Sequence, residues 1–466
     1  MAESCQRKGD SEAMYVHVRF AGTFCDTMVG VSDGLEMHVH AGLVRVMGLD
    51  QPPPVLLSVL VVRWWDYYSN STWSDYSVTN DGLHKDLVDG RCGMYPTLAG
   101  EFEMYTAFIK YSADLDRISE HWAQAALQGL NTLVWYFLWP QQMVAADRTG
   151  GCVQEHQLFA LCQRMERAGL RSGWPHPSQL YRQLCGKLWI PQMSLNREHC
   201  VPPTTRVQYA DVRCDAQRAA AQAISQLLRI RGQVWGQPAV PPEDFRGVAK
   251  LGFSWQGDDV LPFQGSANLA RVLVRLFEQH HSSQTVCLVQ EIVPDVVCEY
   301  RILCFHDAAS GSDSYVREGL WLKMKPKGEH HNHQSVSEVK EFALTSANVI
   351  SDEEAATEFF GGDRQARDEA RAAAERLADR WLLWLAAECA DPAPVTRLDF
   401  LIPRRSRRAK GPLAWTCEVG ECGASLCSVE CDARNCATLN WAVRTDPSGR
   451  FPLALPAIAR NNGWKS

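Results

Sequence analysis

The sequence lacks a hydrophobic stretch long enough to cross a membrane as a helix. Its longest apolar runs, residues 55–62 and 133–139, fall far short of the roughly 18 to 20 residues that such a helix needs. The first fifteen residues carry charges and contain no apolar core, so they do not resemble a secretory signal. We therefore expect a soluble, cytoplasmic protein with no membrane partner.

An excess of positive charge is also missing. The 466 residues carry a formal net charge of −7, so bulk electrostatics do not favour nucleic acid as a partner, although a substrate site can still be locally basic. The tightest group of the seventeen cysteines, between Cys417 and Cys436, lacks the paired C-x-x-C spacing of zinc sites. We expect reduced thiols, and metal binding by this group or by the histidines at 330, 331 and 333 stays open.

The length predicts two or three domains. Residues 1–50 form an uncertain strand-rich segment, and three prolines at 52–54 mark a boundary. An α/β domain is predicted over residues 51–185, with an irregular insertion at 64–93, a strand at 55–63, helices at 101–110, 118–130 and 153–168, and a strand at 132–139. Ser178 is expected to cap a helix that continues to about residue 189.

Residues 186–466 predict an α+β domain. A helix with Asp215 near its start runs to 230, and further helices cover 268–279 and 363–389. Strands are expected at 247–250, 287–293, 298–306 and 319–325, the last three as an antiparallel meander. Two more strands, 397–402 and 414–420, are joined by the basic turn 404–411. The role of residues 1–130 is not legible from the sequence.

A lysine and a loop with glycines follow one another at the end of the strand 247–250. Lys250 precedes a segment that contains Gly252, Ser254 and Gly257. An ammonium group neutralises phosphate charge, and turn amides donate hydrogen bonds to phosphate oxygens, so this arrangement suits a triphosphate. The alternative is a surface hairpin with a solvated lysine.

Two acidic residues interrupt apolar strands near the C-terminal end. Asp399 lies in RLDFLI and Glu418 in WTCEVG. A carboxylate inside a strand core is costly unless a cation or a metal compensates it. Magnesium takes oxygen ligands and often binds through two carboxylates plus phosphate oxygens, so the pair indicates Mg²⁺ on a nucleotide. A buried salt bridge to Arg397 or another cation is the alternative.

The order of these pieces resembles the ATP-grasp family over residues 175 to 445, preceded by a segment that resembles the α/β pre-ATP-grasp domain. The resemblance implies an ATP-grasp domain at 186–466, with a nucleotide-clamping subdomain at about 203–292 and a metal-binding subdomain at about 293–466. It places ATP between the sheet that carries Lys250 and the sheet that carries Asp399 and Glu418. It further implies a hinge that binds adenine through its backbone, where side-chain identity matters little: Gln290, Glu291, Ile292 and Val293.

The same resemblance assigns further roles. Lys187, ahead of Pro203, matches a second phosphate-binding lysine. Glu299 resembles the carboxylate that binds ribose hydroxyls, and Arg301, on the same strand face, would contact the transferring phosphoryl group or the substrate carboxylate. Lys323 could line the phosphate side, although it alternates with a neighbouring lysine as on a solvated strand face.

The implied activity is that of an ATP-dependent ligase, which activates a small-molecule or peptide carboxylate as an acyl phosphate for attack by an amine or thiol. The family usually carries Glu-x-Asn as its second metal motif, and Gly420 stands here in place of the asparagine. Glu421 could substitute only if the strand bends or bulges. The number of Mg²⁺ ions, one or two, is therefore left open. Two alternative functions are also left open: a phosphotransferase that acts on a hydroxyl, and a nucleotide-binding module without turnover.

Overall fold

The structure is a computed structural model, and it describes residues 26–32, 35–40, 57–64, 102–109, 114–118, 132–137, 154–174, 178–252, 260–278, 286–306, 315–323, 325–326, 340–341, 349–389, 395–404 and 411–419. Several predicted features lie outside these residues: the insertion after residue 64, most of the helix 118–130, Ser254 and Gly257, the histidines at 330–333, the centre of the basic turn, and everything from Gly420 onward. The predictions for these segments stay predictions.

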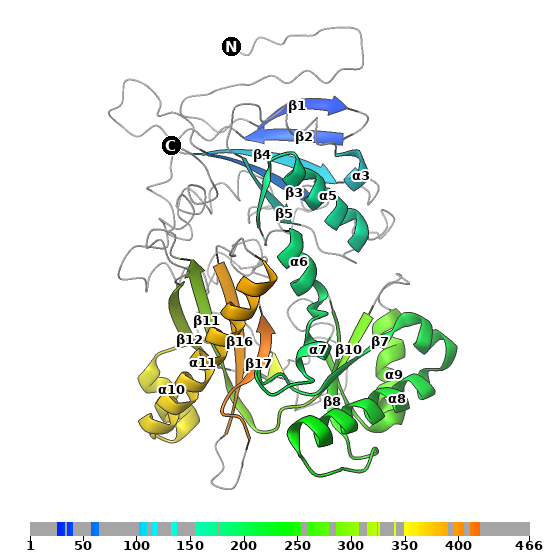
Figure 1. The fold of residues 1–466 in the computed structure, drawn as a ribbon, viewed down its shortest axis with the longest axis vertical. Helices are drawn as coiled ribbons and strands as arrows, with labels where there is room; N and C mark the ends of the chain where they lie inside the picture. The colour runs from blue at the N-terminus through cyan, green and yellow to red at the C-terminus, as the bar shows by residue number, and fades with distance from the viewer. Residues whose placement is uncertain are drawn as a thin grey trace.

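The described residues form three large sheets and one two-stranded sheet, and Figure 1 shows the six-stranded sheet at the top, the four-stranded sheet at the lower right and the five-stranded sheet at the lower left. The six-stranded sheet has the order β1-β2-β4-β3-β5-β6. Its strands are β1 Asp26–Ser32, β2 Leu35–His40, β3 Leu57–Trp64, β4 Phe102–Ile109, β5 Thr132–Phe137 and β6 Arg171–Trp174. The predicted strands near 55–63 and 132–139 are confirmed as β3 and β5.

The helix predicted at 101–110 is wrong, because these residues form β4. β4 pairs with β2 on one side and with β3 on the other. Its sequence FEMYTAFI is rich in aromatic and β-branched residues, which favour a strand that is paired on both edges. Among the described residues, two helices accompany this sheet: α3 Asp114–Arg117 and the predicted helix α5 Glu155–Arg167, which ends before Gly169 at φ +86°.

A broken helical segment leads from this sheet to the other two. It consists of α6 Ser178–Leu184, the 3₁₀ turn η3 Cys185–Lys187, and α7 Ile190–Met193. The sequence predicted one helix here, but Gly186 and Lys187 have φ angles of 67° and 57°, in the left-handed region that interrupts a helix. Ser178 begins α6 as expected, although its hydroxyl donates to Glu166 at 2.5 Å instead of capping the helix.

The four-stranded sheet is antiparallel throughout, with the order β7-β10-β8-β9. It contains β7 Thr204–Gln208, β8 Arg246–Leu251, β9 Val260–Gln264 and β10 Val286–Glu291. Helices α8 Tyr209–Trp235 and α9 Gly265–Glu278 pack on it around a core that includes Leu273 and Phe245. α8 restarts at Asp215, which leaves helical geometry and whose Oδ1 accepts the Arg218 amide at 2.9 Å. The strand β9 was not predicted.

The five-stranded sheet is also antiparallel, with the order β15-β12-β11-β16-β17. Its strands are β11 Val296–His306, β12 Tyr315–Lys323, β15 Val349–Ile350, β16 Val395–Pro403 and β17 Trp415–Val419. Helices α10 Asp352–Phe360 and α11 Arg364–Glu388 follow β15, and β13 Lys325–Pro326 pairs with β14 Lys340–Glu341. The α+β fold class predicted from the sequence is confirmed.

The predicted three-strand meander is wrong in one respect, because β10 and β11 belong to different sheets. The chain changes sheet between Glu291 and Val296, where Asp295 adopts a φ of 54°. This left-handed residue lies between the two predicted strands, where the chain turns from one sheet to the other. β11 and β12 do pair antiparallel, as predicted.

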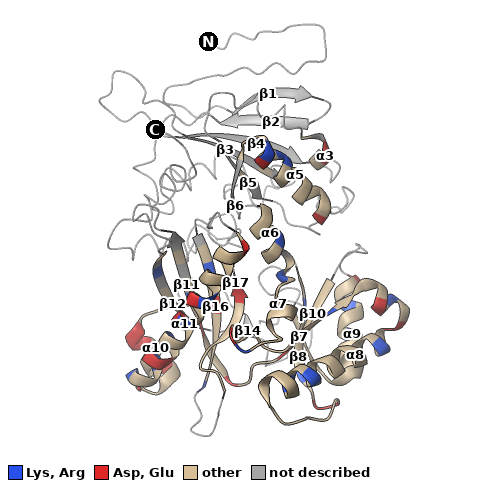
Figure 2. Cartoon of the chain, viewed as in Figure 1, with Lys and Arg blue, Asp and Glu red and all other residues tan. Residues whose placement is uncertain are grey.

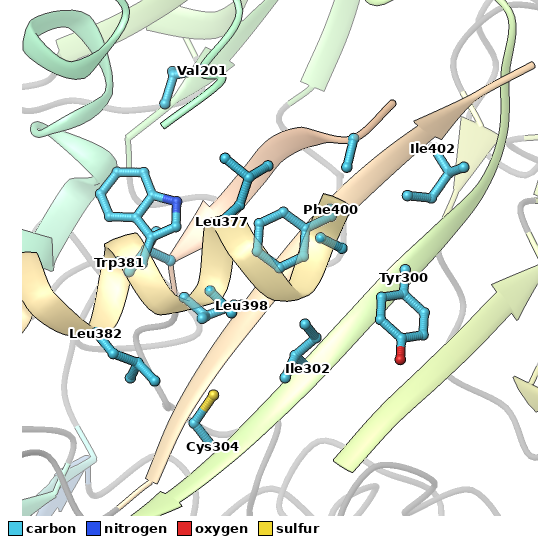
Figure 3. Packing of buried hydrophobic residues seen from close by; sticks show 14 of the residues in the cluster. Val201, Tyr300, Ile302, Cys304, Leu377, Trp381, Leu382, Leu398, Phe400 and Ile402 are labelled. Carbon is cyan, nitrogen blue, oxygen red and sulfur yellow. The ribbon is translucent and has the colours of Figure 1, made fainter. Parts of the chain in front are cut away.

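The largest core lies between α11 and the five-stranded sheet, as Figure 3 shows. Trp381 of α11 is fully buried beside Phe400 of β16, and Trp381 Nε1 donates to Thr416 Oγ1 at 3.0 Å. Thr416 in turn donates to the His199 carbonyl at 2.5 Å. Because Thr416 is only 1% exposed, both hydrogen bonds lie inside the core. Each such large side chain contributes about 1.5–3 kcal/mol on burial, so this core fixes β16 and β17 firmly.

No helix in the described ranges is long and apolar enough to cross a membrane.

Candidate active site

One face of the five-stranded sheet carries a row of charged residues. On β11, Tyr300 and Ile302 point into the α11 core, so Glu299 and Arg301 lie on the opposite face. Arg301 is directly across from Asp399 of β16, and Asp399 is directly across from Glu418 of β17. Figure 2 shows charged segments on these neighbouring strands. The register therefore brings together residues that are 98 and 19 positions apart in the chain.

A β-bulge at Cys417 is what puts Glu418 in this row. Thr416 pairs with Phe400, and Glu418 pairs with Asp399, so Cys417 is the extra residue. In a regular strand Thr416 and Glu418 would share a face. Because of the bulge, the Thr416 side chain points into the core while Glu418 lies beside Asp399 on the charged face. This bulge precedes Glu418 and is separate from the one that Glu421 would have needed.

Three cationic side chains hold the two carboxylates. Arg301 contacts both Asp399 oxygens, from Nε to Oδ1 at 2.8 Å and from Nη2 to Oδ2 at 2.9 Å. Arg397 bridges the two acids, with Nε 3.2 Å from Asp399 Oδ2 and Nη2 2.8 Å from Glu418 Oε2. Lys187 Nζ lies 3.1 Å from Glu418 Oε1. We call these five residues the cation cluster.

The cation cluster is largely shielded from water. Arg301 and Asp399 are 4% and 2% exposed. Arg301 Nη1 is buried and has no hydrogen-bond partner among the described residues. A buried guanidinium nitrogen without an acceptor is costly, so it is a donor available to an anionic ligand.

Glu299 and Glu418 respond to this environment in opposite directions. Burial and the neighbouring Asp399 raise the pKa of Glu299 to about 8, although Arg301, whose Nη2 donates to it at 2.9 Å, opposes the shift. Burial also pushes the pKa of Glu418 upward, but Lys187 and Arg397 outweigh it and hold that pKa well below its usual range. The surroundings therefore favour the neutral form of Glu299 and the ionised form of Glu418.

Lys187 reaches the site through a close backbone crossing. Gly186 and Lys187 form the left-handed turn after α6, and Gly252, the residue that follows β8, lies against it. A Cβ added to Gly252 would come within 2.4 Å of the Gly186 carbonyl oxygen. Gly252 thus has a packing role between the two segments, which its predicted place in a phosphate loop did not include.

Lys250 lies on the other side of the same site. It is 7% exposed, and Nζ donates to Gln290 Oε1 at 3.1 Å. Gln290 Nε2 in turn donates to Thr204 Oγ1 at 2.8 Å. Burial lowers the pKa of Lys250, which also senses Cys417, Lys187 and Glu418. Lys250 therefore lies close to the cation cluster, and the Gln290 side chain orients it.

The remaining hinge residues are held mainly by their backbones. The Glu291 amide donates to the Pro203 carbonyl at 2.9 Å, and the Ile292 amide donates to the Arg246 carbonyl at 3.2 Å. The Glu291 carboxylate forms an ion pair with Arg231 of α8. Because two of the predicted hinge amides already have partners, base recognition would have to use other backbone groups of the hinge.

Lys323 is not brought to the site. It pairs with the buried Cys298 across β11 and β12, so it lies on the sheet face opposite Arg301 and Glu299. Its Nζ forms an ion pair with Glu358 of α10.

Arg397 is a site residue that the sequence indicated only as a salt-bridge alternative. Arg397 lies two positions before Asp399 on one strand, and this spacing was the signal that both residues share the charged face.

Asp399 and Glu418, as arranged here, do not fit a magnesium site. Each of their four carboxylate oxygens has a lysine or arginine nitrogen within 3.2 Å. A magnesium ion needs oxygen ligands at about 2.0–2.1 Å, and these cations stand where it would approach. No group of three or more metal-binding side chains occurs in the part of the chain that the structure describes. The salt-bridge alternative predicted this pairing with Arg397.

Comparisons with known proteins reveal only distant similarity. No protein-family model matches the chain, and no curated protein matches its sequence. A structure of D-cycloserine synthetase DcsG is similar over 87% of this chain and 99% of its own, with 16% identity and a TM-score of 0.44.

Two further solved structures are similar to a comparable extent. D-alanine–D-alanine ligase from Bacillus anthracis complexed with ATP matches over 87% of this chain and 96% of its own, with 11% identity and a TM-score of 0.42. VanG D-Ala:D-Ser ligase from Enterococcus faecalis matches over 87% and 99%, with 10% identity and a TM-score of 0.45. With TM-scores below 0.5, these matches assign no activity and no residue role, and the ATP-grasp resemblance concerns the fold alone.

Proposed function

We propose that this protein binds ATP and uses it to activate a carboxylate as an acyl phosphate, which an amine or a thiol then attacks. The observation that carries the proposal is the convergence of cations from separate elements. Lys250 comes from the four-stranded sheet, Lys187 from the turn η3, and Arg301 and Arg397 from the five-stranded sheet. Four cations that neighbour one another in a largely buried site suit a polyphosphate.

The nucleotide would lie against both sheets. Lys187 and Lys250 neutralise phosphate charge, and Glu299 serves the ribose. A protonated Glu299 can both donate and accept a hydrogen bond, which matches a sugar hydroxyl. The adenine base would be bound by the backbone of Val293. Its amide donates to no backbone carbonyl in the described ranges, whereas the amides of Glu291 and Ile292 do.

In the proposed reaction a substrate carboxylate oxygen attacks the γ-phosphorus of ATP. The bond from that phosphorus to its bridging oxygen breaks and ADP leaves with the electron pair. An amine or thiol then attacks the acyl carbon, phosphate departs, and the nucleophile's proton passes to solvent. Arg301, whose Nη1 has no hydrogen-bond partner in the described part of the chain, stabilises the negative charge of the transferring group. No step is assigned to magnesium, because its predicted ligands are engaged by cations.

The test is ADP formation by the full chain with panels of carboxylates paired with amines or thiols. Hydroxylamine traps an acyl phosphate as a hydroxamate, so ADP and hydroxamate should appear together and only with a carboxylate. Arg301→Ala should abolish both. The matched control Arg317→Ala, which removes an arginine paired with Asp379 on the other sheet face, should leave both unchanged. ADP formation without any carboxylate would contradict the proposal.

A second candidate is a nucleotide-binding protein without turnover. The engagement of both predicted metal ligands by cations favours it, together with Gly420 in place of the usual asparagine. The two candidates differ in one result: ATP binding with no ADP for any acceptor supports the second. A phosphotransferase would instead form ADP with a polyol alone.

A further inference from the structure

Every carboxylate oxygen of Asp399 and Glu418 lies within 3.2 Å of a lysine or arginine nitrogen, although Asp399 Oδ1 makes no hydrogen bond among the described residues. Arg301 contacts both oxygens of Asp399, Arg397 contacts one oxygen of each acid, and Lys187 contacts the other oxygen of Glu418. The contacts span the turn η3 and three adjacent strands. Such a complete set is expected of carboxylates that position cations.

The charges of the cation cluster favour the binding of an anion over the binding of a metal ion. The cluster contains three cationic side chains and two carboxylates, and Lys250 lies nearby. The adjacent Glu299 is held by Arg301 Nη2 at 2.9 Å, and burial and Asp399 raise its pKa, which favours its neutral form. A divalent metal entering alone would meet like charges, whereas a polyphosphate would meet opposite charges while the carboxylates keep the cations in place.

The carboxylates also fix side chains that would otherwise be mobile. Lysine and arginine lose much rotamer freedom when they bind a ligand, and this loss weakens binding. Here Arg301 and Arg397 are already ordered, at 4% and 9% exposure, by contacts within the sheet. Most of the ordering cost is therefore met when the chain folds.

We infer that Asp399 and Glu418 are positioning residues for a preformed phosphate cradle made by Lys187, Arg301 and Arg397, and that this cradle binds a nucleoside triphosphate without a divalent metal. The inference rests on the proposed nucleotide binding and departs from the metal-ligand role predicted for the two acids. The order of events follows: the nucleotide binds first, and any divalent ion that participates arrives with it.

The test is a calorimetric titration of the full chain with ATP, once with excess Mg²⁺ and once with EDTA. The expected result is a dissociation constant that rises less than about tenfold in EDTA. A larger rise overturns the inference but leaves the proposed function standing, because ATP would still bind with Mg²⁺. Absence of binding in both buffers overturns the proposed function and the inference with it.

A second measurement uses Mn²⁺ alone, monitored by the electron paramagnetic resonance signal of the free ion. Without nucleotide, the wild-type chain should not bind Mn²⁺ at the site up to about 1 mM. To assign any binding to the site, the titration is repeated with Asp399→Asn and with the matched control Asp379→Asn, which alters an aspartate–arginine pair on the other sheet face. Wild-type binding below 1 mM that Asp399→Asn alone removes overturns the inference.

Arg397→Ala tests the bridge between the two acids. This variant should weaken ATP binding in EDTA by at least about tenfold, because it removes a cradle cation. Arg371→Ala, which removes an arginine paired with Asp352 between α10 and α11, is the control and should change affinity by less than about twofold. An Arg397→Ala protein that remains folded and keeps wild-type affinity in EDTA contradicts the cradle. If the variant does not fold, the ATP titrations and the Mn²⁺ titration of the wild-type chain still test the inference.

Discussion

Replacing Glu299 by glutamine should make the protein more stable than wild type at high pH but not at low pH. Glu299 is 2% exposed, and its carboxylate lies beside Arg301 and near Asp399. Burial and Asp399 raise its pKa to about 8, against the opposing charge of Arg301. Glutamine is the neutral isostere of the protonated acid and keeps an oxygen that can accept from Arg301 Nη2.

The sign follows from proton linkage. Between the ordinary glutamate pKa of 4.5 and about 8, the folded protein holds a proton that the unfolded chain releases, so the free energy of unfolding falls as pH rises. At about 1.4 kcal/mol per pKa unit, the loss has an upper limit of about 5 kcal/mol. Neighbouring charged groups titrate together with Glu299 and share this effect, so we expect a change on the order of 2 kcal/mol.

The assay is urea unfolding of both proteins at pH 5, 7 and 8.5, with the wild-type value subtracted from that of Glu299→Gln at each pH. The difference should grow with pH in favour of the variant by roughly 2 kcal/mol. A flat or opposite trend for Glu299→Gln would refute the reasoning, because it would mean that Glu299 is already ionised at pH 5 as the partner of Arg301.

Three further changes test the packing around the site by urea unfolding and ATP titration. Gly252→Ala puts a methyl group 2.4 Å from the Gly186 carbonyl oxygen and should cost about 1–3 kcal/mol of stability; unchanged stability would argue against the close crossing. Gln290→Leu removes the acceptor of Lys250 and should weaken ATP binding, whereas an unaltered affinity would show that the amide does not orient the lysine. Phe400→Ala empties a fully buried position and should cost about 3–5 kcal/mol; a loss below 1 kcal/mol would contradict the described core.

The sequence predicted the strands of the site because their apolar residues alternate with a few charged ones. Asp399 and Glu418 were identifiable as acids inside apolar strands, and Arg301 as a residue two positions from Glu299 on one face. Their convergence could only be proposed, since it depends on which strands pair and in which register. The register that joins Arg301 to Asp399 and Asp399 to Glu418 is a property of long-range contacts.

Other features were beyond local patterns. The segment 101–110 forms a strand because it pairs on both edges, which its own sequence does not state. The bulge at Cys417 shifts Glu418 to the charged face against the expected alternation. Lys323 was assigned to the wrong side because its face depends on its pairing with Cys298. In each case tertiary pairing overrides local periodicity.

The most direct test of the account is a titration of the full chain with ATP in the presence of Mg²⁺, compared with the same titration of Lys250→Gln. The account predicts saturable binding at one site, weakened at least about tenfold in a Lys250→Gln protein whose circular dichroism spectrum is unchanged. Absence of ATP binding by the wild-type chain, or equal affinity in the two proteins, would contradict the claim that these cations form a nucleotide site.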